Sequence, residues 1–248
     1  MNLRVVDSGT YSEPVQQALE RVLIDRLGDG EIEPTLRFWY RDGPAVPLGR
    51  FQAYADEVAA DYVAKHDVDV VRRITGGGAM YVEPGAVITY SLYLPRSAVS
   101  DDVEASYAEL DQFAIDALRD LGLDVRHEPL NDIAHPDGKI GGAAQLRTDD
   151  AVVHHTTMSY ALDIAEMLRV LRIGEEKVSD KAVASAEKRV ARINDHVDAS
   201  RSEVIETMID TAGDSYATVE GELSESTLAD ARTLADEQFA TDEWNRQL

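Results

Sequence analysis

The chain has 248 residues, no cysteine and a formal net charge of -23. This length is typical of one large domain or two small ones, and a hydrophobic fraction of 44% is enough to build a folded core. The missing cysteine excludes a disulfide scaffold, a thiolate metal site and a cysteine nucleophile. The negative charge argues against binding to nucleic acid or to an anionic membrane, because phosphates repel it.

The many acidic residues are combined with few lysines, which stand only at positions 65, 139, 177, 181 and 188. This composition indicates a protein of an extremely halophilic cytoplasm, where dense carboxylates keep the surface hydrated; an ordinary acidic protein is the alternative. The first residues lack the apolar stretch of a signal peptide, and no run of about 18 apolar residues is present to span a membrane. We therefore expect a cytoplasmic protein.

In chain order, a strand over Leu3–Val6 leads to a helix that begins after Ser12, an N-cap candidate. Val15 and Leu19 lie on the apolar face of this helix. The next segments are expected to form a strand, a short helix and two further strands rich in β-branched and aromatic residues, in this order: Leu36–Tyr40, Asp56–Lys65, Val68–Ile74 and Val87–Leu94.

The second half begins with a long helix from about Asp102 to Leu121, which Gly122 closes. A hairpin, a further strand, a helix and a helical tail are expected after it, at Asn131–Ile133 with Lys139–Arg147, at Ala151–Leu162, from Asp163 and from about Ser202. Helices separate some strands while others pair directly. This order predicts an α+β fold with a mixed, mostly antiparallel sheet flanked by helices. We expect residues 1–248 to form one domain, with 200–248 a helical C-terminal segment.

The first candidate for chemistry is the segment 72–79, Arg-Arg-Ile-Thr-Gly-Gly-Gly-Ala, which follows a predicted strand. Three glycines let backbone N–H groups approach an anion or a flat ligand, and Arg72 and Arg73 supply positive charge for a phosphate or carboxylate. The segment has neither the dinucleotide pattern nor the lysine of a P-loop. A flexible hairpin loop is the alternative.

The second candidate is Lys139, which follows the Asp137-Gly138 turn and opens a strand of small residues. Such a strand makes a floor for a ligand, and a lysine at its rim reaches a carboxylate or phosphate. Asp132 on the partner strand is expected to face the same region. We expect Arg72, Arg73 and Lys139 to form a positive island at a common pocket. A solvent-exposed lysine and a turn-capping aspartate are the alternatives.

The third candidate is the pair His154-His155 within a predicted strand. Adjacent strand residues point to opposite faces, so the two imidazoles do not chelate one metal. We expect one ring to line a pocket and the other to pack in the core or at the surface. The chain shows no nucleophile elbow of a Ser-His-Asp hydrolase.

Together, these motifs resemble the lipoate–protein ligase family, part of the wider biotin/lipoate ligase group. The resemblance covers nearly the whole chain, and the family motifs are L-G-R-x-Q, R-R-x-S/T-G-G-G-A, N-D, K-I/V-S-G-S-A-Q, H-H-G-T and E-W-N. They correspond here to Leu48–Gln52, Arg72–Ala79, Asn131-Asp132, Lys139–Gln145, His154–Thr157 and Glu243–Asn245. Such a series of motifs in the same order is a specific match.

The resemblance implies an ATP- and Mg²⁺-dependent enzyme that forms lipoyl-adenylate from lipoate. Such an enzyme transfers the lipoyl group to a lysine of a lipoyl domain, in a 2-oxoacid dehydrogenase E2 or the glycine cleavage H protein. Lys139 matches the motif lysine and is the implied catalytic residue. Arg73 is expected to hold the carboxylate or phosphate, and Asp132 to contact the adenylate or Mg²⁺. The other residues implied in substrate and adenylate binding are Gly76, Gly77, Gly78, Ala79, Gly141, Gly142, His155 and Thr157.

The chain departs from the family pattern at four positions. Val82 stands where a histidine is usual, Ala86 where an asparagine is usual and Gly141 where a serine is usual. Leu146 replaces a common arginine, and the adjacent Arg147 is a candidate substitute. Each lost polar contact is expected to weaken adenylate binding by about 1–3 kcal/mol.

The E-W-N motif lies close to Leu248, so an accessory domain is expected as a separate small subunit, as in split archaeal-type ligases. Two further hypotheses remain open. One is another acyl or biotinyl adenylate enzyme of the same fold, although the loop fits the arginine-rich biotin ligase motif worse. The other is a non-catalytic paralogue that binds an acyl group or a lipoyl domain. Octanoyltransferases of this fold need a cysteine, which this chain lacks.

Overall fold

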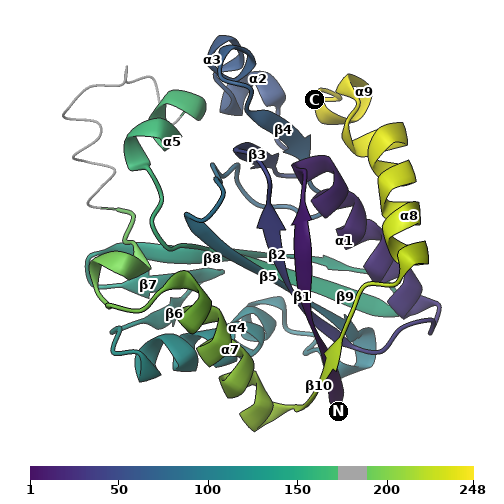
Figure 1. Ribbon diagram of the computed structural model, residues 1–248, viewed down its shortest axis with the longest axis vertical. Coiled ribbons are helices and arrows are strands. Elements are labelled where there is room, and N and C mark those ends of the chain that lie inside the picture. The colour runs from purple at the N-terminus through teal and green to yellow at the C-terminus, as the bar shows by residue number, and fades with distance from the viewer. Residues whose placement is uncertain (173–188) are drawn as a thin grey trace.

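A computed structural model describes residues 1–172 and 189–248 of the chain. A mixed eight-stranded sheet with the strand order β10-β1-β2-β5-β9-β8-β7-β6 crosses the middle of the protein (Figure 1). The strands are β1 (Asn2–Tyr11), β2 (Thr35–Arg41), β5 (Val87–Pro95), β6 (Arg126–Glu128), β7 (Asp132–His135), β8 (Gly138–Arg147), β9 (Ala151–Ser159) and β10 (Ala217–Gly221). β1 pairs in parallel with β10 and β2, and the other neighbours pair antiparallel. The predicted α+β fold with a mostly antiparallel sheet is confirmed.

Helices cover both faces of this sheet. The helices α1 (Glu13–Gly28) and α8 (Glu225–Leu234) pack together on one face, and α4 (Val103–Asp120) and α7 (Arg201–Ser215) pack together on the other (Figure 1). The shorter helical segments are α2 (Tyr54–Glu57), α3 (Ala60–Lys65), η1 (Arg96–Ala98), α5 (Ile164–Val170), η2 (Ile193–Asp195), η3 (Ala235–Phe239) and α9 (Asp242–Asn245). No helix in the described ranges is long and apolar enough to cross a membrane.

A second, two-stranded parallel sheet of β3 (Ala45–Leu48) and β4 (Asp69–Arg72) lies beside the main sheet. Its apolar side chains form a separate core with α2, α3 and α5. The loop that leaves β4 contains the three glycines, so this small sheet places the loop beside the inner strands β8 and β9 of the main sheet.

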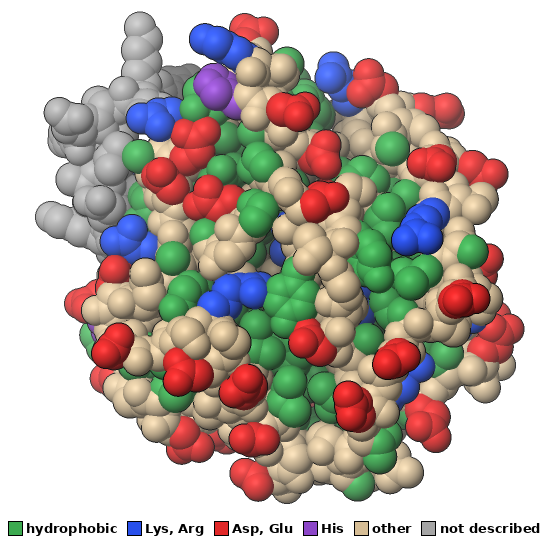
Figure 2. Space-filling view, in the orientation of Figure 1, with side chains coloured by type: hydrophobic (Ala, Val, Ile, Leu, Met, Phe, Trp, Pro, Cys, Tyr) green, Lys and Arg blue, Asp and Glu red, His purple; other side chains and the backbone are tan. Residues whose placement is uncertain are grey.

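Acidic side chains are spread over the face that Figure 2 shows, with few basic side chains among them.

The long helix α4 begins and ends as expected, because the Asp102 carboxylate accepts from Ala105 N–H at 3.1 Å and Gly122 adopts a positive φ of 98°. Both ends of this helix therefore follow ordinary capping chemistry.

Two sequence predictions are wrong in detail. The helix expected over Asp56–Lys65 is split into α2 and α3, because Val58 is extended, fully buried and bridged to Leu171. The tail expected to be helical contains the strand β10, which extends the main sheet beside β1. Its exposed residues carry little apolar patterning, since an edge strand is held by backbone pairing.

Candidate active site

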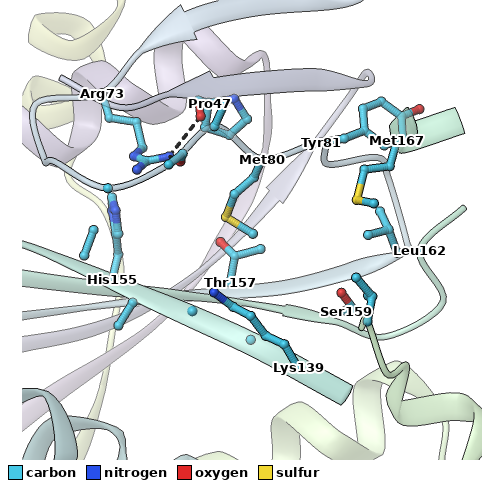
Figure 3. Close-up of a pocket in the computed structure, with 18 of the residues that line it drawn as sticks. Pro47, Arg73, Met80, Tyr81, Lys139, His155, Thr157, Ser159, Leu162 and Met167 are labelled. Carbon is cyan, nitrogen blue, oxygen red and sulfur yellow. Dashed lines mark hydrogen bonds between the residues drawn. The ribbon is translucent and has the colours of Figure 1, made fainter. Parts of the chain in front are cut away.

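A cavity of about 370 Å³ lies between β8, β9 and the loop that follows β4. Its two ends differ in chemistry (Figure 3). Tyr81, Leu162 and Met167 make one end apolar, whereas Arg73 and His155 make the other end polar. Such a cavity suits a ligand with an apolar chain and an anionic head group.

The Arg73 guanidinium holds the glycine loop in one conformation. It donates to the carbonyl oxygens of Pro47 at 2.9 Å, Gly76 at 2.6 Å and Gly78 at 3.2 Å, and to Thr75 Oγ1 at 3.2 Å. Burial lowers the pKa of Arg73 to about 10, so the group stays charged at neutral pH. Arg73 therefore both fixes the loop and places a positive charge in the cavity wall.

Two glycines are required where this loop meets the preceding one. Gly77 has a φ of +88°, in the left-handed region that glycine adopts readily. A Cβ atom on Gly49 would lie 1.9 Å from the carbonyl oxygen of Gly77. The predicted motifs at 48–52 and 72–79 are therefore in direct backbone contact.

The Lys139 side chain lies across its own strand toward the cavity. Its Nζ forms an ion pair with Asp132 Oδ1 at 2.6 Å. A Cβ atom on Gly142 would lie 2.8 Å from this Nζ, so the glycine leaves room for the ammonium. The Lys139 backbone is also paired, because its N–H donates to Arg189 O at 2.9 Å and its carbonyl accepts from Ala191 N–H at 2.9 Å.

His155 connects the glycine loop to helix α1. Its Nδ1 lies 2.9 Å from Glu20 Oε2 and its Nε2 lies 3.0 Å from Thr75 Oγ1. Burial lowers the pKa of His155, although Glu20 opposes this shift. Burial would raise the pKa of Glu20, but its hydrogen bond to His155 and the charges of His155 and Arg37 lower that pKa overall. The pair therefore holds the loop through a buried polar bridge.

A second buried ion pair supports the cavity floor. Arg41 Nε lies 2.5 Å from Glu13 Oε2, and Arg41 also donates to Thr89 Oγ1 at 2.9 Å. The Thr89 hydroxyl lies 3.1 Å from that of Thr157. Thr157 and Arg41 both line the cavity.

Sequence reasoning missed several members of this site. Arg41, Glu20, Gln17 and Asn131 were not among the expected residues, although Gln17, Asn131 and Arg41 line the cavity. A usable pattern was present in α1, where Glu13, Gln17 and Glu20 lie among buried positions. Charged groups are almost never fully buried unless they are paired, so this face indicated an internal polar cluster.

Most of the predicted site residues line one cavity. They are Arg73, Gly77, Gly78, Ala79, Lys139, Gly141, Gly142, His155 and Thr157. Gly76 and Asp132 are outside the cavity lining: Gly76 faces the exposed ring of Phe51, and Asp132 reaches the site through Lys139. The two histidines point to opposite faces of β9 as predicted, because His154 bonds to Asp111 on α4.

The prediction that Arg72 belongs to a positive island is wrong. The Arg72 side chain is fully buried and donates to the carbonyl oxygens of Gln52, Asn245 and Gly49 at 2.7, 2.9 and 3.0 Å. Successive strand residues point to opposite sides, so Arg73 faces the cavity while Arg72 holds the C-terminal helix α9. Among the described residues, the positive groups that line the cavity are Arg41, Arg73, Lys139 and Arg189.

The departures from the family motifs have local explanations. Val82 is fully buried and pairs with Ala45, and Ala86 is nearly buried. At Gly141 an added Cβ would lie 2.6 Å from Met158 Cγ, so the methionine side chain leaves no room for a serine at this position.

Arg147 does not replace the arginine expected at position 146. Its guanidinium donates to Ser100 O at 2.9 Å and to the Ser106 hydroxyl, on the side of α4. Leu146 packs against the core cluster on the opposite face. The alternation of strand residues again separates the two neighbours.

The cavity offers few protein ligands for a divalent cation. Among the described residues of its wall there is no aspartate or glutamate, and Asp132 offers the carboxylate beside Lys139. Mg²⁺ commonly takes one or two carboxylates and completes its shell with substrate phosphates and water. The residues present fit an ion that is carried on nucleotide phosphates, with Asp132 as a single ligand.

Residues 13–213 match the family described as lipoyl protein ligase A/B catalytic domain. Lipoate-protein ligase A subunit 1 of Thermoplasma acidophilum is 33% identical over 231 residues, which cover 87% of this chain and 86% of that protein. Octanoyltransferase LipM of Halalkalibacterium halodurans is 26% identical, with 98% of each chain covered.

Solved structures show the same fold. A bi-partite lipoate protein ligase from T. acidophilum, studied with its E2 lipoyl domain, has a TM-score of 0.89 at 30% identity and covers 99% of this chain and 96% of that one. A putative lipoate protein ligase from T. acidophilum with bound lipoic acid has a TM-score of 0.85 at 27% identity, with full coverage of both chains at 100%.

Lipoate-protein ligase A bound with ATP has a TM-score of 0.84 at 28% identity, with 99% of each chain covered. The family match spans most of the chain, and both the sequence relative and the solved structures agree with it. The chain therefore belongs to the lipoyl protein ligase A/B catalytic domain family.

Proposed function

We propose that this chain is the catalytic part of an ATP-dependent lipoate–protein ligase, which transfers lipoate to a lysine of a lipoyl domain. The observation that carries the proposal is the cavity itself. Lys139, the Arg73-tied glycine loop and His155 meet in one cavity with an apolar end. Relatives of this fold are named lipoate-protein ligases, one solved with lipoic acid and another with ATP.

Two steps account for the reaction. A lipoate carboxylate oxygen attacks the α-phosphorus of ATP, the P–O bond to the β-phosphate breaks and pyrophosphate leaves. The acceptor lysine amine then attacks the acyl carbon, an amide forms, the amine proton is lost and AMP leaves with the electron pair of the broken C–O bond. In this proposal Lys139 and Arg73, which both line the cavity, stabilise negative charge on the carboxylate and on the phosphate.

The other residues have supporting roles in this proposal. Asp132 orients the Lys139 ammonium through their ion pair and offers one oxygen to Mg²⁺ on the nucleotide. The apolar end at Tyr81, Leu162 and Met167 takes the acyl chain. The remaining predicted binding residues, which border the acyl and adenylate groups, are Gly76, Gly77, Gly78, Ala79, Gly141, Gly142, His155 and Thr157.

The proposed protein partner is a lipoyl domain, and a separate small subunit is proposed to support adenylation. A structural relative from T. acidophilum is described as a bi-partite ligase with its E2 lipoyl domain. The glycine cleavage H protein is a second candidate acceptor. A cytoplasmic location in a halophilic organism stays a prediction from composition and charge.

Two alternatives have specific support. Another acyl group is a candidate substrate, because relatives of similar length include an octanoyltransferase; this chain has no cysteine for a covalent acyl-enzyme. A binding-only paralogue is favoured by the changed positions 82, 86, 141 and 146, whereas the retained Lys139, paired with Asp132, disfavours it.

The test is the intact mass of a lipoyl-domain acceptor after incubation with the chain, lipoate, ATP and Mg²⁺ at high salt. We expect the acceptor to gain one lipoyl group, and no gain when ATP is omitted or when the acceptor lysine is changed to arginine. A candidate small subunit is included in a parallel reaction and should accelerate pyrophosphate release. An acceptor that stays unmodified with the subunit present would contradict the ligase proposal.

A further inference from the structure

A cluster of metal-ligating side chains lies outside the cavity, at the far end of the β7–β8 hairpin. His135 ends β7, Asp137 lies in the turn, and His196 follows the short helix η2. One ligand atom from each residue can be chosen so that all three lie within 4.8 Å of one another. The proposed role of the cavity uses none of these three residues.

The distances are close to those of a metal centre. Asp137 Oδ2 lies 3.6 Å from His135 Nδ1 and 3.9 Å from His196 Nε2. In a tetrahedral zinc site with bonds of about 2.0–2.2 Å, neighbouring ligand atoms are separated by about 3.4 Å. A shift of roughly 1 Å or less in the exposed Asp137 side chain would bring its carboxylate to this distance from either histidine nitrogen.

The two imidazoles are already arranged for a shared ligand. Their ring centroids lie 4.0 Å apart, and the side chains of His135 and His196 are only 11% and 22% exposed. The backbone N–H of Asp137 donates to His135 Nδ1 at 3.1 Å, so this nitrogen is unprotonated, and a metal bound to it would replace this hydrogen bond. A metal takes the unprotonated form of such a nitrogen.

The donor types select the class of metal. Two imidazoles and one carboxylate suit Zn²⁺ and its transition-metal neighbours, whereas Mg²⁺ prefers an all-oxygen shell. One carboxylate against a divalent ion leaves a local charge of +1, which a chain of net charge -23 accommodates. Three protein ligands leave one position for water.

The cluster joins two segments that border the active cavity. The segment 189–191 pairs with Lys139, and Gly138 is packed so closely on this segment that a Cβ atom would lie 2.8 Å from Arg189 C. His196 lies five residues after Ala191 in the same stretch of chain. A metal shared by His135 and His196 would therefore fasten this stretch to the hairpin that carries Lys139.

We propose that His135, Asp137 and His196 form a binding site for a divalent transition metal, with Zn²⁺ as its reference ion. The bound metal links the β7–β8 turn to the segment that follows residue 188, beside the cavity. The site does not depend on the ligase function, since none of its three residues lines the cavity.

The experiment titrates the untagged, EDTA-treated and dialysed full chain with Zn²⁺ at fixed high KCl, against a competing chromophoric chelator. The variants His135→Gln, His196→Gln and Asp137→Asn test the site, and His66→Gln on the exposed end of α3 is the matched control. Thermal unfolding with Zn²⁺, or with an equal concentration of Mg²⁺, gives a second measurement. Circular dichroism establishes that each variant is folded.

We expect one Zn²⁺ per chain in the wild type and in His66→Gln. Each of the three site variants should bind at least about tenfold more weakly, because even outer-shell changes cost 10- to 100-fold. Zn²⁺ should raise Tm by mass action, and Mg²⁺ should not. Hydrogen exchange of the Ala191 amide should slow with Zn²⁺ in the wild type but not in His196→Gln.

Three results would overturn the proposal. One is the absence of stoichiometric Zn²⁺ binding by the wild-type chain. Another is wild-type affinity in both His135→Gln and His196→Gln, which would assign the ion to other groups on the acidic surface. The third is a Tm increase that Mg²⁺ reproduces, which would indicate general cation binding.

Discussion

Two buried histidine–carboxylate clusters flank the same strand, and they differ in what lies beyond them. On one face of β9, His155 bonds to Glu20 of α1 and its other nitrogen reaches Thr75 of the glycine loop. On the other face, His154 bonds to Asp111 of α4 at 2.7 Å. Only the first of these two clusters borders the cavity.

The two clusters contain similar side chains, but their locations give them different roles. Asp111 also accepts from the Tyr90 hydroxyl at 2.5 Å and from Thr156 at 2.6 Å, so its hydrogen-bonding partners are buried groups of the core. The Glu20 cluster instead extends to a loop that a ligand would contact. Similar side chains therefore serve the packing of the sheet on one face and the shape of the site on the other.

The largest expected effect is a loss of stability when the buried cluster around Asp111 is disrupted. Asp111→Ala should lower the free energy of unfolding by about 3–5 kcal/mol, because its buried polar partners would lose the carboxylate to which they are hydrogen-bonded. Ligation per folded molecule should stay near the wild-type value. Urea unfolding measures the first quantity and acceptor mass the second. Asp116→Ala, on the exposed side of the same helix, is the control and should cost less than about 1 kcal/mol.

The next effect contrasts the two histidines directly. His155→Gln should slow lipoyl transfer by about tenfold, since it loosens the glycine loop by the loss of one buried hydrogen bond. His154→Gln should change the transfer rate of folded protein less than twofold and instead lower stability. Single-turnover transfer rates, measured where both variants are folded, test this contrast. Equal slowing by both substitutions would remove the distinction between the faces.

A smaller effect concerns pH. The pKa of His155 is lowered from 6.5 by burial, so the unfolded chain takes up this proton more readily than the folded one. The stabilising contribution of neutral His155 is complete above about pH 6.5 and declines as the pH falls from there toward the folded pKa. His155→Gln should flatten the stability curve below about pH 6.5, as measured by urea unfolding.

The carboxylates provide an internal control for that curve. The pKa of Glu20 and that of Asp111 are lowered from 4.5 and 3.8, mainly because paired groups outweigh the effect of burial. Their contributions are complete above those values and are lost as the pH falls through the lower folded pKa. A slope just below pH 6.5 that His155→Gln leaves unchanged would contradict the role given to this histidine.

Local patterns predicted much of the site. The alternation of a strand separated His154 from His155, and the hairpin brought Lys139 beside Asp132. The same rule, applied to Arg72 and Arg73, would have shown that both cannot face one cavity. The split of the helix at Val58 and the strand β10 were missed, because pairing with Leu171 and with β1 is decided by distant residues.

The buried clusters were beyond local reasoning for a related reason. Glu20 and His155 are 135 positions apart, and Asp111 and His154 are 43 apart. A buried position for Glu20 was indicated by the apolar neighbours on α1, but its partner depends on how that helix lies across the sheet. The proposed metal site also joins a hairpin turn to a segment about 60 residues later, as the positions 135, 137 and 196 show.

The central claim is that Lys139 acts in lipoyl transfer from this cavity. The most direct measurement is transfer from pre-made lipoyl-adenylate to a lipoyl domain by the wild type, Lys139→Ala and Lys65→Ala, the last being an exposed lysine of α3. We predict that the wild type and Lys65→Ala transfer at similar rates and that Lys139→Ala loses at least about 100-fold, as when a group that stabilises developing charge is removed. Equal transfer by Lys139→Ala would contradict the account.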